Sequence, residues 1–217
     1  MTSASDVPVR EPGTRARSGN AMGRTRSALL SATAECIARY GIRKTTMVDV
    51  ASKSGVAKAT LYNHFRTKDD VLAALVEQQV ADLVGACVIT ASAAGLPAAL
   101  GQAATALATS ASLRKAAEGE QALLAPLAVP GEGRGWQLAR EGVAAVLTAG
   151  RAPNGPAEVE LVLRWCVSQL LWPLAADQVQ AASAALLRGL VTAPIVPESH
   201  LNAVPARSDA GAVGWPA

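Results

Sequence analysis

The pattern Thr-x-x-Asp occurs twice within a short stretch, from Thr46 to Asp49 and again from Thr67 to Asp70. In a capping box of this kind, the threonine and the acidic side chain satisfy backbone N–H groups that have no partner at the start of a helix. Each pattern therefore predicts the start of a helix, the first one short and the second one long.

Gly55 lies between the two predicted starts and predicts the end of the first helix, whose sequence is MVDVASKS. A second short helix is expected from Ala57 to about Phe65, and the long helix from Thr67 to about Val88. Two short helices separated by a tight turn that contains glycine form the helix-turn-helix pattern.

The two faces of the second short helix differ in chemistry. Leu61 and Phe65 are four residues apart and are expected to pack inward. The other face carries small and polar side chains, namely Lys58, Ala59, Tyr62 and Asn63. Small residues let a backbone approach the DNA major groove, and polar ones reach base edges and phosphates. The pattern favours DNA binding over the alternative, a solvated amphipathic helix.

Charge is distributed unevenly along the chain. Residues 1–70 carry 12 Lys and Arg against 6 Asp and Glu, a net charge of +6, whereas residues 71–217 carry 8 against 11, a net charge of −3. A basic N-terminal third attached to a mildly acidic remainder predicts one module for a polyanion and another with a different role. Chance clustering of charges is the alternative.

Residues 41–77, GIRKTTMVDVASKSGVAKATLYNHFRTKDDVLAALVE, resemble the DNA-binding signature of the TetR family of bacterial transcription regulators. The shared features are a Thr-Thr helix start, an Asp/Ala-containing helix, Gly-Val, and Thr-Leu-Tyr-x-His-Phe followed by x-x-Lys and an acidic residue. The resemblance covers about residues 24–80. It implies an all-α fold, in which an N-terminal three-helix helix-turn-helix domain precedes a C-terminal helical domain for ligand binding and dimerisation.

The resemblance also implies roles for individual residues. Thr46 would contact a phosphate in addition to capping its helix. Lys58 would read bases, because its ammonium group suits O6 and N7 of guanine. Ala59 and Thr60 would follow on the side of the groove.

Four further residues complete the expected DNA contacts. Tyr62 and His64 resemble the family's pair of residues that bind the DNA backbone, and Asn63 occupies another frequent contact position. Lys68 lies in the first turn of the long helix, where backbone N–H groups already favour a phosphate. For His64, the alternative is a half-buried structural role.

Residues 1–23 are rich in Ser, Gly, Pro and Arg and lack apolar periodicity, so they are expected to form a disordered basic arm. Arg24 and Arg26 follow this arm, next to a first helix that is expected over residues 25–40. Arginines in such a place can enter a minor groove or follow phosphates. For the arginines within the arm itself, a solubilising role is at least as good an interpretation.

No charged residue occurs from Leu83 to Leu113. Only eight residues of this stretch are Leu, Ile or Val, and Pro97 interrupts it, so two buried soluble helices are expected rather than a membrane span. Further helices are expected over residues 96–109, 112–127, 135–149, 157–174 and 178–191.

The helix expected over residues 157–174 is apolar almost all round, with Arg164 as the one charge between Leu161 and Ala176. A helix that is apolar on every side must be covered on every side. The simplest cover is the same surface of a second copy in a symmetric bundle. The TetR resemblance implies the same homodimer, because members of that family usually dimerise through their last two helices.

A ligand pocket is expected between about residues 96 and 175, where aromatic residues are few and many Ala and Gly leave space between helices. The candidate wall residues are Trp136, Trp165 and Trp172, with Gln137 and Gln169 as polar groups that orient a ligand. A mostly apolar lining favours a hydrophobic or aromatic effector. The alternative is that the three tryptophans are ordinary core or dimer-interface residues.

The sequence indicates no catalytic site, cofactor or metal site. Its histidines are His64 and His200, and no cluster of His, Cys and carboxylates has metal-ligand spacing. Cys36, Cys87 and Cys166 lie in apolar runs without a CxxC pair, which favours core positions in a reducing, cytoplasmic setting.

These observations predict a cytoplasmic, homodimeric transcription regulator that binds a near-palindromic operator in double-stranded DNA. Most simply, it is a repressor released by a small apolar effector. A constitutive architectural DNA-binding protein without an effector is the alternative, and an enzyme or carrier with an incidental helix-turn-helix is the third. The expected parts are a basic arm at 1–23, a helix-turn-helix domain at 24–70, a ligand-binding and dimerisation domain at 71–193 and a loosely ordered tail at 194–217.

Overall fold

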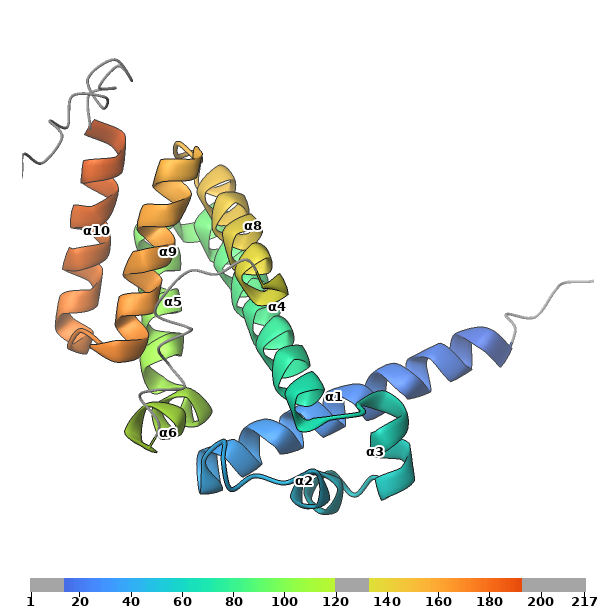
Figure 1. The fold of residues 1–217 in the computed structure, drawn as a ribbon. Coiled ribbons are helices and arrows are strands. Elements are labelled where there is room, and N and C mark those ends of the chain that lie inside the picture. Colours follow the sequence, from blue (N-terminus) through green and yellow to red (C-terminus); the bar gives the residue numbers. More distant parts are fainter. Residues whose placement is uncertain (1–13, 120–132, 193–217) are drawn as a thin grey trace, which may run out of the picture.

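The computed structural model describes residues 14–119 and 133–192, and every regular element in these two ranges is an α-helix. The all-α prediction is confirmed. Three helices lie at one end of the molecule (Figure 1), and they are α1 (Thr14–Tyr40), α2 (Met47–Ser54) and α3 (Lys58–His64). The others are α4 (Lys68–Ala94), α5 (Leu96–Thr109), α6 (Ala111–Gly119), α8 (Arg134–Ala149), α9 (Pro156–Leu171) and α10 (Ala176–Thr192).

The helix α1 is longer than the sequence pattern predicts. It begins at Thr14, so residues 14–23, predicted as part of a disordered arm, belong to this helix, while residues 1–13 lie outside the described chain. Residues 21–24 are exposed, and a helical segment that packs against nothing carries no apolar periodicity. Its helical state therefore comes from continuation of the packed turns that start at Leu29, because adding a residue to an existing helix is far easier than nucleating one.

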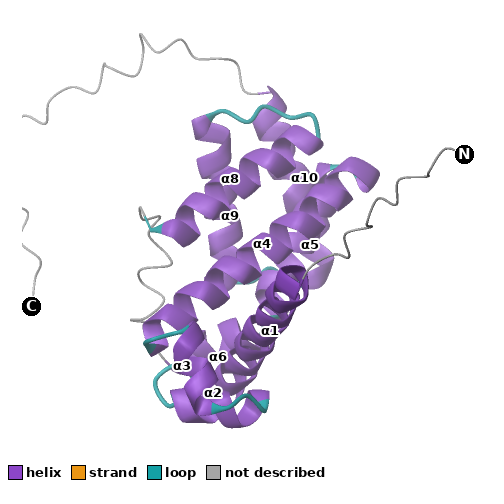
Figure 2. Cartoon of the chain, turned by 90° about the vertical axis from the view of Figure 1, so that its right-hand side faces the viewer, coloured by secondary structure: helices purple, strands orange, loops and turns teal. Residues whose placement is uncertain are grey.

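Two hydrophobic clusters stabilise the fold. The first is formed by α1, α2, α3 and the start of α4, with the fully buried side chains of Leu29, Leu30 and Leu61 at its centre. The second is formed by the end of α4 with α5, α8, α9 and α10, and Leu147 and Val162 are among its most buried members. In Figure 2, the helices of the second cluster lie at one end of the molecule and α2 and α3 at the other.

The long helix α4 belongs to both clusters. Val71, Ala74 and Leu75 pack in the first cluster, and Cys87 and Ala91 pack in the second. The sequence predicted a domain boundary after residue 70. Val71, Ala74 and Leu75 complete the first core, so that boundary would separate them from the rest of the core. The molecule has a second connection between its ends, because α6 packs against α1.

By length and composition alone, α4 is the one described helix that could cross a membrane. It packs against α1, α5 and α8, and its first turn carries Lys68, Asp69 and Asp70. These are the properties of a helix at the centre of a folded bundle, and the fold gives no reason to place α4 in a bilayer.

Small residues bring α4 and α8 close together. A Cβ atom on Gly142 of α8 would lie 2.2 Å from Cγ2 of Val84 on α4, and one on Gly135 would lie 3.3 Å from Cγ1 of Val76. Real Cβ atoms do not approach within 3.0 Å of such a neighbour. The absence of a side chain at Gly142 therefore sets the separation of the two helices.

We expect Gly142→Ala to destabilise the protein, because the added methyl group would force α4 and α8 apart or push Val84 out of place. Overpacking of this kind typically costs about 1–3 kcal/mol of the free energy of unfolding. Denaturant-induced unfolding, followed by circular dichroism, would measure the change.

Gly85→Ala is the matched control. Gly85 lies in the adjoining turn of α4, and a Cβ atom there would meet nothing within 4 Å. Alanine in place of glycine within a helix should stabilise by up to about 1 kcal/mol. Equal effects of the two substitutions would contradict the close-packing interpretation.

Candidate nucleic-acid interface and cavity

A capping box holds the start of α2. Oγ1 of Thr46 accepts a hydrogen bond from the N–H of Asp49 at 3.2 Å, and the Thr46 N–H donates to Oδ2 of Asp49 at 2.9 Å. The Thr46 hydroxyl also donates to the same carboxylate oxygen at 2.6 Å. These bonds to the hydroxyl and then to the backbone N–H lower the pKa of Asp49. Because the hydroxyl serves the cap, any phosphate contact of Thr46 has to share it.

The turn between α2 and α3 depends on glycine. Gly55 ends α2 with φ of +69°, a left-handed conformation that side chains with a Cβ atom rarely adopt. This sharp end directs the chain into α3 after only two further residues, Val56 and Ala57. The predicted helix-turn-helix is therefore present in the structure, with the predicted cap and terminator.

The buried side of α3 fixes the direction of its exposed side. Leu61 is fully buried and Phe65, directly after the helix, is 4% exposed, so both anchor α3 in the first cluster. The side chains that face solvent are those of Lys58, Ala59, Tyr62 and Asn63. Tyr62 is 42% exposed, which is unusual for a large ring that has a core beside it. This exposed face is the surface that the sequence pattern assigned to DNA.

Two of the residues predicted to contact DNA are partly buried in the protein. Thr60 and His64 are half-buried, and the His64 ring lies 6.2 Å from the Phe65 ring, centroid to centroid. For His64, this placement is compatible with both the structural role and the DNA role that the sequence leaves open.

Lys68 makes contacts that the sequence did not predict. Its ammonium group donates hydrogen bonds to the carbonyl oxygen of Ile42 and, at 3.2 Å, to that of Arg43. Lys68 thereby ties the first turn of α4 to the turn between α1 and α2. The predicted phosphate contact of Lys68 would compete with these two bonds or use the third N–H of the ammonium group. No local sequence signal could have revealed this contact, because its partners lie about 25 positions away along the chain.

Arg24 and Arg26, the two basic residues predicted to lie beside the DNA, have different surroundings on α1. Arg24 is exposed on α1, and Arg26 places its guanidinium carbon 5.2 Å from the centroid of the Phe65 ring. A guanidinium group over an aromatic face is held by a cation–π interaction. Arg26 is therefore positioned at the junction of α3 and α4, next to the proposed DNA-facing surface.

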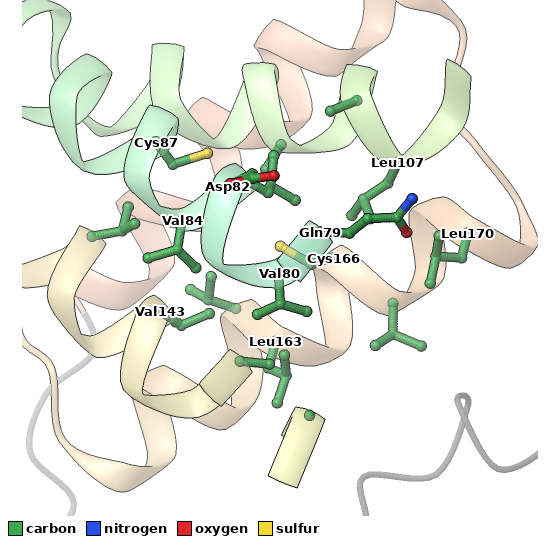
Figure 3. A pocket seen from close by; sticks show the side chains of 18 of the residues that line it. Gln79, Val80, Asp82, Val84, Cys87, Leu107, Val143, Leu163, Cys166 and Leu170 are labelled. Carbon is green, nitrogen blue, oxygen red and sulfur yellow. The ribbon is translucent and has the colours of Figure 1, made fainter. Parts of the chain in front are cut away.

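A cavity of about 520 Å³ lies within the second half of the molecule (Figure 3). Its wall comes from α4, α5, α8 and α9 and from the start of α6, and it is almost wholly apolar. Representative wall residues are Val80, Leu100, Leu107, Val143, Leu163 and Leu170. The size falls within the range of small-molecule sites in proteins.

The structure corrects most of the predicted pocket residues. Trp136 lines the cavity, but Gln137, Trp165, Gln169 and Trp172 do not belong to its described wall. Gln137 is exposed, Trp172 is 80% exposed, and Trp165 packs against the second cluster. The reason is helical geometry, because on α9 it is Cys166 and Leu170 that face the cavity, and Trp165 lies about 100° away from Cys166.

Gln169 lines a smaller pocket beside this cavity, which shares Leu107 and Leu170 with it, and also has a structural task. Its side chain is buried, its Oε1 accepts a hydrogen bond from the Leu174 N–H at 3.1 Å, and its Nε2 donates to Oγ of Ser168 at 3.1 Å. These bonds hold the segment that follows α9. The sequence analysis also missed Gln79 and Asp82, which lie on the cavity wall. They belong to α4, outside the region in which a pocket was expected.

The two thiols on the cavity wall, those of Cys87 and Cys166, both have raised pKa values. Burial, with a smaller contribution from Cys87, raises the pKa of Cys166 to about 12. Burial also raises the pKa of Cys87, whose Sγ lies 3.5 Å from the Ala99 carbonyl oxygen. Within the described residues, no group of three or more His, Cys, Asp or Glu side chains could hold a metal ion.

The segment that forms the first cluster resembles a known protein family. Residues 29–75 match the model for bacterial regulatory proteins of the tetR family. No curated protein sequence matches the chain significantly.

Solved structures resemble the whole described fold. The TetR family repressor AlkX from Dietzia sp. is 18% identical, with a TM-score of 0.59 over 76% of this chain and 94% of that one. A TetR-family transcriptional regulator from Pectobacterium atrosepticum is 22% identical, with a TM-score of 0.58 over 84% of this chain and 100% of that one. At these identities, the likeness concerns the fold.

We expect acid to weaken the starts of α2 and α4. The Asp49 and Asp70 carboxylates accept hydrogen bonds from Thr46 and Thr67, which lower the pKa of each below its ordinary value. Their contribution to stability is therefore complete above roughly pH 4, the unfolded value, and is lost as the pH falls through the lower folded-state value. Thermal unfolding of Asp49→Asn and Asp70→Asn between pH 7 and pH 3 should show a smaller loss of Tm than the wild type shows.

Asp69→Asn is the control, because it removes a carboxylate from the same turn of α4 without breaking a capping bond. If its Tm profile matched those of the two cap variants, the capping explanation would be wrong.

Proposed function

We propose that this chain, whose residues 29–75 form a TetR-family DNA-binding domain, is a repressor that binds a near-palindromic operator and is released by a small apolar molecule. That it is a DNA-binding transcription regulator of the TetR family follows from the family match and from the fold. Repression, the operator symmetry and the effector are the parts that we add.

The observation that best supports the proposal is the exposed face of α3. Lys58, Ala59, Tyr62 and Asn63 face solvent while Leu61 and Phe65 lock the opposite side of the helix. A recognition helix has to present polar groups at a fixed angle and keep its own backbone free to enter the major groove. We assign base contacts to Lys58, groove contacts to Ala59 and Thr60, and backbone contacts to Thr46, Tyr62, Asn63, His64 and Lys68, with Arg24 and Arg26 beside them.

Symmetry of the operator requires a dimer of the protein. The outer stripe of α9 supports such a dimer, because Leu161 is 47% exposed and Trp172, directly after the helix, is 80% exposed. Trp165 and Ser168 lie on the same stripe by helical spacing. Exposed large apolar side chains that are aligned along one helix are typical of an interface between copies. We therefore propose a homodimer through α9, and through α10 as its sequence neighbour.

The cavity supports regulation by a ligand. Its wall includes Gln79, Leu83 and Cys87 of α4, and the same helix completes the first core at Val71 and Leu75. A ligand that changes the position of α4 would therefore change the position of α3. Such a ligand releases DNA only if it binds the DNA-free form of the protein more tightly than the DNA-bound form. The difference between these two binding free energies equals the free energy by which the ligand weakens DNA binding. We place this regulator in the cytoplasm, where its DNA is found.

The alternative is an architectural DNA-binding protein without an effector. It would bind operator and random DNA alike, and no ligand would change its affinity. Selection of bound sequences from a random pool of DNA decides between the two, because a repressor enriches one near-palindromic sequence.

We expect Lys58→Ala to lose discrimination at one or two positions of the selected operator. The loss should be about 1–3 kcal/mol, the value of one good base contact. Tyr62→Phe keeps the ring and removes the hydroxyl group, so it should weaken operator and random DNA by the same factor. Equal losses on both kinds of DNA for Lys58→Ala would exclude base recognition by this residue.

We expect Leu161→Glu to break the dimer without unfolding the protomer, because the carboxylate would be buried without a partner only in the dimer. Analytical ultracentrifugation would measure the change in mass. Ile89→Glu is the control, since Ile89 is an exposed apolar residue of α4, 71% exposed. Leu170 is unsuitable for this test, because it faces the cavity. A wild-type monomer that binds its operator tightly would contradict the dimer.

A further inference from the structure

The cavity has one polar region, and it lies on α4. Apart from the Trp136 indole and the thiols, the polar side chains of the described wall are those of Gln79, Asp82 and Ser110. Asp82 carries the one carboxylate of this wall, and no Lys, Arg or His side chain lies on it. Asp82 is also exposed to solvent, so it marks the rim of the cavity rather than its depth.

Ser110 already has partners within the protein. Its hydroxyl group lies 3.2 Å from that of Ser112 and is 3.5 Å from the Leu113 nitrogen, at the start of α6. Gln79 and Asp82 differ from it, because neither makes a side-chain hydrogen bond or ion pair with another residue of the described chain. The free polar groups of the wall are therefore one amide and one carboxylate.

Gln79 and Asp82 lie near each other in the sequence of α4. They are three residues apart on α4, which makes their side chains neighbours on the helix surface. Figure 3 shows the Asp82 carboxylate and the Gln79 amide projecting from the same helix among apolar side chains such as Leu107 and Cys87. One face of this pair meets the cavity and the other meets solvent, so a ligand could reach both groups with its polar end while its body stays inside.

We propose that the cavity binds an amphiphilic cation, with an apolar body between α4, α5, α8 and α9 and a protonated amine at the rim. The amine would pair with the Asp82 carboxylate and donate a hydrogen bond to the Gln79 carbonyl oxygen. This inference rests on the proposed function, because it specifies the effector of the same cavity.

Charge decides between this class and its competitors. A fatty acid has an apolar body of the same shape, but its carboxylate would meet Asp82 and no basic group on the described wall. Like charges repel, so the carboxylate of the fatty acid would be disfavoured beside Asp82. A neutral alcohol could bond to Gln79 but would gain nothing from the charge of Asp82. A cation alone uses both groups.

The test compares three ligands that share one ten-carbon chain: decylamine, decanol and decanoate. At neutral pH the amine is cationic and the acid is anionic. Each ligand competes with the neutral fluorescent probe N-phenyl-1-naphthylamine for the cavity of the full-length protein. The concentration of each ligand is kept below the value at which that ligand forms micelles. We expect decylamine to bind about three- to fivefold more tightly than decanol, as for a partly exposed ion pair, and decanoate to bind more weakly than decanol.

Two substitutions assign the preference to the rim. Asp82→Asn should make decylamine and decanol equal, and Asp82→Lys should reverse the order of decylamine and decanoate. Glu77→Gln is the control, because Glu77 lies on α4 outside the described cavity wall, and it should leave the order unchanged. Asp82 is exposed, so these variants should fold, and circular dichroism would verify it.

The outcomes separate this inference from the proposed function. Decanoate binding as tightly as decylamine, or an order that Asp82→Asn leaves unchanged, would overturn the cationic class while the cavity stays a binding site. Failure of the probe and of all three ligands to bind would overturn both the effector class and the ligand-responsive function. Binding of decylamine in the expected order without release of operator DNA would support the site and contradict its regulatory role.

Discussion

The structure depends on the continuity of α4 through two hydrophobic cores. Val71 and Leu75 belong to the first cluster, where α4 packs against α1, and Cys87 and Ala91 belong to the second, where α4 packs against α5 and α8. A helix that is packed at both ends transmits displacement, because closely packed interiors deform little. The helix therefore joins the core that carries α3 to the core that encloses the cavity.

Lys68 adds a polar connection at the junction. Its ammonium group donates hydrogen bonds to the carbonyl oxygens of Ile42 and Arg43, which connects the first turn of α4 to the turn after α1. On the other side of the molecule, α6 packs against α1 and its first turn borders the cavity at Leu113. Two packed connections, α4 and α6, therefore join the cavity wall to the helix-turn-helix end of the molecule.

Small residues explain both the close packing and the empty space of the second half. Where a glycine opposes a larger residue, as Gly142 opposes Val84, the helices approach closely. On the cavity wall, small residues such as Ala99 and Ala103 of α5 and Ala139 of α8 have side chains too short to fill the space in front of them. Of the three tryptophans predicted for this wall, only Trp136 lies on it in the described structure, since Trp172 is exposed and Trp165 packs outside the cavity.

The sequence alone determined the helix-turn-helix, the polarity of α3 and most helix positions, because caps, terminators and the spacing of Leu61 and Phe65 are local signals between residues near in sequence. It misplaced the start of α1, which has no apolar pattern over residues 14–23. Only the tertiary structure decided which side chains line the cavity, how Gln169 is used and what Lys68 holds. Those outcomes depend on the rotation and separation of helices that are distant in sequence, and a shift of one residue on a helix turns a side chain by about 100°, from the cavity toward another neighbour.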